Sequence, residues 1–90
     1  MIYQNKEIDF MIYQLKDIQL LVETGKIKSA QASHEPLLGG WTLTFTGTRK
    51  DEVFPLYAQR GEALRAFKGL DALQNVVKKL GLAEFTVKCF

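Results

Sequence analysis

The chain has 90 residues, of which 47% are apolar and 24% charged, and its formal net charge is +2. This length and balance predict one globular domain. They exclude a membrane span, which needs about 18–20 consecutive apolar residues, and an internal disulfide framework, because Cys89 is the single cysteine. No signal-peptide pattern opens the chain. We therefore expect a reducing, cytoplasmic setting.

The opening of the chain repeats itself. Met1–Gln4 returns as Met11–Gln14. The copies are not equivalent, because Asn5 in the first copy stands where the second has Leu15, which breaks the helical apolar stripe. Residues 1–10 are therefore an N-terminal extension. They arise either from a duplicated start site, which chain termini tolerate, or from an added strand or helix that covers a sheet edge or forms a dimer contact.

A first helix is predicted over residues 12–24. Apolar side chains recur there at spacings of three to four, and Thr24-Gly25 is a typical helix end. The segment is more apolar than one buried stripe requires, so we expect it to pack on more than one side or on a partner. The candidate oligomer-interface residues are Ile12, Tyr13, Leu20 and Leu21.

Four extended segments are expected next, at residues 26–34, 41–46, 53–59 and 63–68. The second is the clearest, because strict alternation places Trp41, Leu43 and Phe45 on the core face and threonines on the other. In the third, Pro55 indicates an edge strand or a bulge. The fourth is expected to return beside the third as a hairpin.

A second helix is predicted from Leu70 to Leu80. Asp71 in its first turn and the Lys78-Lys79 pair in its last turn suit the helix dipole. The last strand is expected over residues 84–90 with three side chains directed inward, namely Phe85, Val87 and Cys89.

This order of elements predicts a single small α+β domain over residues 11–90. Strands joined by short turns favour an antiparallel sheet of four or five strands, with the two helices packed on one face. The opposite face, which carries the threonines of residues 41–46, is expected to stay wet.

The residues give no sign of catalytic chemistry, which needs positioned acids, bases or nucleophiles. His34 is the only histidine and is expected in a surface loop, and Cys89 is expected to be a buried small hydrophobe. The sequence has no cluster of metal-ligating residues and no phosphate loop or dinucleotide fingerprint. We predict a non-enzymatic protein with no cofactor and no metal site.

A set of basic residues on successive turns forms the candidate nucleic-acid-binding site: Arg49, Lys50, Arg60, Arg65 and Lys68. Adjacent hairpin turns can lie side by side, and a joint patch would contact phosphates. Neighbouring acids partly neutralise these residues, and the net charge is low for a dedicated nucleic-acid binder. An ordinary set of solvated turns is therefore the alternative.

Several stretches resemble a family of small bacterial proteins encoded on plasmids and integrated mobile elements, some of them labelled ParC-type partition-associated proteins. The stretches are LKDIQLLVETG (15–25), GW (40–41), YAQRGE (57–62), RAFKGLDA (65–72), KLGL (79–82) and FTV (85–87). The resemblance spans residues 11–90 and leaves out residues 1–10, which favours the duplicated start. It implies an accessory role in plasmid partition or maintenance and supplies no catalytic residue.

Two functional hypotheses follow from the sequence. The first is an accessory protein of a mobile element that acts through protein contacts, as a homodimer or with partition proteins of the same element. The second is a protein that binds DNA directly through the five basic residues named above. Neither hypothesis involves a membrane.

Overall fold

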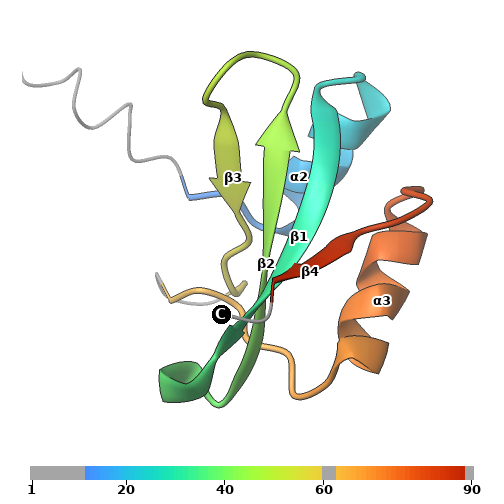
Figure 1. The fold of residues 1–90 in the computed structure, drawn as a ribbon. Helices are drawn as coiled ribbons and strands as arrows, with labels where there is room; N and C mark the ends of the chain where they lie inside the picture. The colour runs from blue at the N-terminus through green and yellow to red at the C-terminus, as the bar shows by residue number, and fades with distance from the viewer. Residues whose placement is uncertain (1–11, 60–62, 89–90) are drawn as a thin grey trace, which may run out of the picture.

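The computed structural model describes residues 12–59 and 63–88. They form a four-stranded sheet with two helices on one face (Figure 1), which confirms the predicted α+β class. The elements in chain order are α2 (Leu15–Glu23), β1 (Ile27–Glu35), the short 3₁₀ helix η1 (Pro36–Leu38), β2 (Gly40–Gly47), β3 (Val53–Pro55), α3 (Leu70–Lys79) and β4 (Thr86–Lys88). The predicted extension over residues 1–10 and the side chains of Arg60 and Cys89 lie outside the described residues.

The strands follow the order β3-β2-β1-β4 in the sheet. β1 and β2 form a long antiparallel hairpin, in which Ala30 lies opposite Phe45 and Ala32 lies opposite Leu43. β3 is antiparallel to β2, whereas β4 pairs with β1 in parallel. The predicted antiparallel arrangement is therefore wrong for β4. The reason is that α3 is a crossover helix, which carries the chain back to the end of the sheet where β1 starts (Figure 1).

The first helix begins at Leu15 rather than at residue 12. Tyr13 is part of a parallel bridge with Leu56, and its carbonyl oxygen accepts a hydrogen bond of 2.9 Å from the Tyr57 N–H. The N–H of Gln14 donates to Oδ2 of Asp17 at 2.9 Å. This contact from the third helical residue back to the N-cap marks the start of the helix, and the apolar spacing alone did not predict it.

The expected strand over residues 63–68 is reduced to two isolated bridges. One joins Tyr57 to Leu64 and the other joins Trp41 to Phe67. The second bridge has a pair of backbone hydrogen bonds, from Phe67 N–H to Trp41 O at 2.8 Å and from Trp41 N–H to Phe67 O at 2.7 Å. Phe67 therefore pairs with β2 beyond the last β2 contact of the chain that follows β3, which is the hydrogen bond of 2.9 Å from Leu56 N–H to Leu43 O.

The core lies between the sheet and the two helices. Its fully buried large side chains are Ile18 of α2, Leu43 and Phe45 of β2, Leu56, and Leu73 and Val77 of α3. β1 contributes the small side chains of Ala30 and Ala32. Since Ile18 is the one buried residue of α2, this helix is covered on a single side, and its remaining apolar residues are half-buried or exposed.

The last strand is shorter and more exposed than predicted. Phe85 is half-buried against the core, as expected, but the side chain of Val87 is 43% exposed. All three residues of the edge strand β4 are exposed, whereas α3 packs over β1 and β2. Among the described residues, no helix has the length and the apolar character needed to cross a lipid bilayer.

Candidate functional site

Of the basic residues named from the sequence, the four that the structure describes do not come together. Arg49 and Lys50 are exposed in the turn between β2 and β3. Arg65 and Lys68 lie on either side of Phe67, which pairs with Trp41 at the opposite end of β2. From Trp41 to the last residue of β2 the strand spans about 20 Å, at roughly 3.3 Å per residue. The expected single patch is therefore divided into two.

Arg65 has a partner within the fold. Its guanidinium carbon lies 4.8 Å from the centroid of the Phe67 ring, a cation–π contact. Its backbone N–H donates to Leu56 O at 3.0 Å. These contacts hold Arg65 against the sheet edge, so a structural role accounts for it.

The structure places two further lysines beside the β2–β3 turn. Ile27 pairs with Gly47, and the Thr48 N–H donates to Lys26 O at 3.3 Å. This antiparallel register joins the start of β1 to the turn that carries Arg49 and Lys50. We call the resulting group the basic end; it consists of the exposed residues Lys26, Lys28, Arg49 and Lys50. Sequence reasoning missed the two lysines because the register between β1 and β2 was unknown.

The candidate interface residues are also divided. The ring of Tyr13 packs edge-on against that of Phe54, with centroids 4.9 Å apart, and Leu21 packs against the core. Both belong to the fold itself. Ile12 is 38% exposed and Leu20 is 60% exposed. Among the residues of α2, all of which the structure describes, Leu20 is the large apolar side chain that faces solvent.

Among the described residues, the most exposed large apolar side chain lies at the end of the β1–β2 hairpin. Leu37 is 99% exposed and its neighbour Leu38 is 45% exposed. We call residues Pro36, Leu37 and Leu38 the leucine tip (Figure 1). The sequence predicted only a turn here. The signal that pointed further was a pair of leucines in a position where turns usually carry polar residues.

Backbone geometry fixes the conformation of the leucine tip. Gly39 takes the left-handed conformation, with φ 75°, and its N–H donates to Pro36 O at 3.0 Å. Below the tip, the His34 and Trp41 rings pack with centroids 4.9 Å apart. Gly40 is buried and lies against the Phe67 carbonyl group. The leucines are therefore presented on a supported turn.

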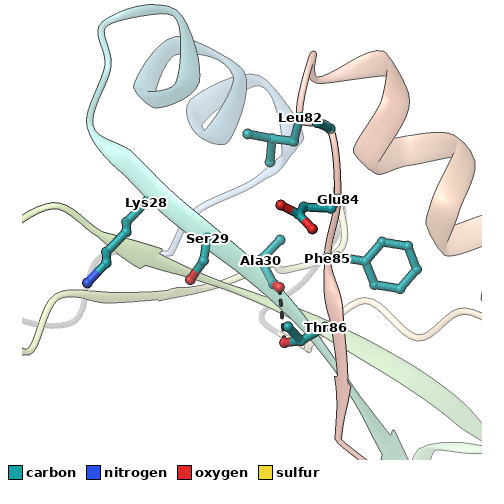
Figure 2. A pocket seen from close by; sticks show the side chains of 8 residues that line it. Lys28, Ser29, Ala30, Leu82, Glu84, Phe85 and Thr86 are labelled. Atoms are coloured by element: carbon teal, nitrogen blue, oxygen red, sulfur yellow. Dashed lines mark hydrogen bonds between the residues drawn. The ribbon is translucent and has the colours of Figure 1, made fainter.

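A pocket of about 400 Å³ lies where β1 and the chain leading into β4 diverge (Figure 2). The two strands pair only over Gln31–Ser33, so a gap opens before that point. Thr86 Oγ1 donates to Ala30 O at 3.4 Å and closes its lower end. We call this the fork pocket; its lining residues are Lys28, Ser29, Ala30, Leu82, Ala83, Glu84, Phe85 and Thr86.

The chemistry that these surfaces offer is that of binding. The leucine tip provides apolar contact, the basic end provides cations, and the fork pocket combines apolar walls with hydroxyl and carboxylate groups. Within residues 12–59 and 63–88, no three His, Cys, Asp or Glu side chains lie close enough together to hold a metal ion. His34 is exposed as expected, but it lies in β1 and not in a loop, because its backbone pairs with Trp41 of β2 and its ring packs against the Trp41 ring.

Comparisons of the chain with family models, with curated proteins and with solved structures found no match.

Proposed function

We propose that this protein is a non-enzymatic binding protein that contacts a partner protein through its leucine tip. The observation that carries the proposal is the 99% exposure of Leu37 on a supported turn. Burying a leucine side chain contributes about 1.5–3 kcal/mol, and the exposed Leu37 does not make this contribution to the fold. A partner with an apolar pocket would recover it, with Leu38 adding to the contact.

The proposed setting is the partition or maintenance of a bacterial plasmid or integrated mobile element, in the cytoplasm. It is supported by the resemblance of residues 11–90 to ParC-type partition-associated proteins, which carries no catalytic motif. The partners in this setting are partition proteins of the same element or a second copy of the chain. The proposal requires neither an enzymatic step nor a cofactor.

Leu37→Asp is expected to weaken binding to the partner by at least about tenfold, because truncating a central apolar anchor typically costs 2 kcal/mol or more. The measurement is isothermal titration calorimetry with each purified partition protein of the element. The matched control is Leu20→Asp, which changes an equally apolar, 60% exposed side chain on α2. Circular dichroism checks that both variants are folded. A partner that binds Leu37→Asp as tightly as the wild type would overturn the proposal.

Direct DNA binding is the second candidate function, and the basic end favours it. Four cationic side chains are grouped there by the β1–β2 register, although Asp51 and Glu52 share the turn. If all four contact phosphates, the logarithm of the affinity falls with the logarithm of the salt concentration with a slope of about −3.6, at roughly 0.9 per contact.

Fluorescence anisotropy with a labelled DNA duplex, at low and at physiological salt, tests this candidate. The combined Lys26→Ala, Arg49→Ala and Lys50→Ala variant is expected to lose binding. The matched control is Lys68→Ala, which removes an exposed cation near the opposite end of the sheet. Equal binding by the triple variant and the wild type would exclude the basic end as the DNA contact.

A further inference from the structure

The leucine tip and the fork pocket lie toward opposite ends of β1. The tip follows the last residue of the strand, Glu35, whereas the pocket is beside Ser29 near its start. Six residues of strand separate these two positions, or about 20 Å at roughly 3.3 Å per residue. Figure 1 shows the tip at the lower end of the hairpin and the chain that lines the pocket beside the upper half of β1. The tip of one chain therefore cannot enter its own pocket.

The fork pocket has the character of a receptor for an apolar side chain. Ala30 is buried and forms part of its wall, while Leu82 and Phe85 are half-buried. In Figure 2, Leu82 and Glu84 extend from the chain that precedes β4 toward β1, into the gap, whereas the Phe85 ring points away from β1. The volume of about 400 Å³ falls in the range of pockets that hold small ligands and is ample for leucine.

We propose that the leucine tip of one copy docks into the fork pocket of a second copy, so that chains associate head to tail. This inference rests on the proposed function and names the partner of the leucine tip. Each chain carries both the exposed apolar group and the pocket, and no residue within 12–59 and 63–88 covers the tip or fills the pocket.

The charges beside the two surfaces are mixed. Glu35 is at the base of the leucine tip, and the exposed Lys28, which lines the fork pocket, is its opposite charge. The exposed carboxylate of Glu84 also lines the pocket; it repels Glu35 but can accept hydrogen bonds from the N–H groups of an incoming turn. An arriving tip thus meets an apolar wall, one attractive charge and one repulsive charge, which agrees with a weak contact.

A contact of this kind joins two different surfaces, so it propagates from chain to chain until it closes into a ring or ends as a short filament. A single tip in a single pocket buries less than the roughly 1,200 Å² typical of stable complexes. The association is therefore weak, and it grows steadily as the protein concentration rises.

Two variants each disable one of the two surfaces that form the contact. Leu37→Asp removes the tip and leaves the pocket intact, whereas Ala83→Trp fills the pocket from an exposed lining position and leaves the tip intact. In sedimentation equilibrium, we expect the wild type to form species larger than a dimer as concentration rises and each variant alone to remain monomeric. An equimolar mixture should form one-to-one dimers and nothing larger, because only one productive contact is left.

A charge exchange provides an independent check that does not alter the apolar groups. Lys28→Glu is expected to weaken self-association by about two- to fivefold, as for an exposed ion pair, because the pocket would then present two carboxylates to Glu35. Adding Glu35→Lys in the same chain should restore it. A wild type that stays monomeric at all concentrations, a mixture of Leu37→Asp and Ala83→Trp that stays monomeric, or variants that assemble like the wild type would each overturn the proposal.

Failure of this inference is distinguishable from failure of the proposed function. A monomeric wild type whose binding to a partition protein is lost in Leu37→Asp excludes head-to-tail docking and leaves the leucine tip as a surface for another protein. Unchanged binding of that partition protein by Leu37→Asp, combined with head-to-tail assembly, would restrict the leucine tip to self-association.

Discussion

Phe45→Ala is expected to lower the free energy of unfolding by about 3–5 kcal/mol, the usual cost of removing a buried phenylalanine ring. Phe45 is fully buried at the centre of β2, opposite Ala30 on one side and Phe54 on the other. The small side chain of Ala30 cannot fill the cavity that is left behind. Urea unfolding followed by circular dichroism measures the loss.

The neighbouring Thr46 supplies the control for that experiment. It lies on the opposite face of β2 and is half-buried, so Thr46→Ala is expected to change stability by no more than about 1 kcal/mol, the span of strand propensities. If both variants lost the same amount of stability, the assignment of Phe45 to the helix-covered face of the sheet would be wrong.

Gly40→Ala is the second substitution with a large expected effect. A Cβ atom at Gly40 would overlap the carbonyl oxygen of Phe67, a backbone atom that cannot swing away as a side chain can. The Trp41–Phe67 pair of hydrogen bonds, 2.7 and 2.8 Å long, would have to open. Overpacking of this kind costs about 1–3 kcal/mol, and in a domain of this size each kcal/mol lowers Tm by about 4–8 °C. Thermal unfolding measures the shift.

Gly69→Ser is the matched control for Gly40→Ala. No atom outside its chain neighbours lies within 4 Å of a Cβ placed at Gly69, and this residue is the N-cap of α3, where serine is preferred over glycine by a few tenths of a kcal/mol. The control is expected to be as stable as the wild type or slightly more so. A Gly40→Ala variant with the same Tm as the control would contradict the close approach of Phe67 to β2.

Local patterns in the sequence predicted the elements whose stability is local. The strand predicted at 41–46 is observed as Gly40–Gly47, and the helix predicted from Leu70 to Leu80 is observed as Leu70–Lys79. Strict alternation predicted the strand but not the burial of each side chain, because Thr42, expected on the wet face, is buried and Trp41, expected in the core, is half-buried. The dipole-matched ends were sufficient to predict α3. By contrast, the parallel pairing of β4 and the shortening of residues 63–68 depend on contacts between distant segments, which no local pattern reports.

The candidate surfaces also differ in whether local patterns in the sequence could predict them. Charge spacing identified Arg49 and Lys50 but not the lysines that join them, because Lys26 reaches that turn only through the β1–β2 register. Leu20 was named because it extends an apolar helix, yet it faces solvent. The exposure of Leu37 results from the lack of any packing neighbour at the hairpin end, and only the folded arrangement reveals it.

The most direct measurement replaces Leu37 with a photo-reactive phenylalanine analogue in cells that carry the host element, followed by illumination and mass spectrometry of the covalent adducts. The same analogue at Leu20 is the control. We predict an adduct from position 37 with a partition protein of the element or with a second copy of the chain, and far less adduct from position 20. Adducts from position 20 with none from position 37, or none from either, would contradict the leucine tip as the binding surface.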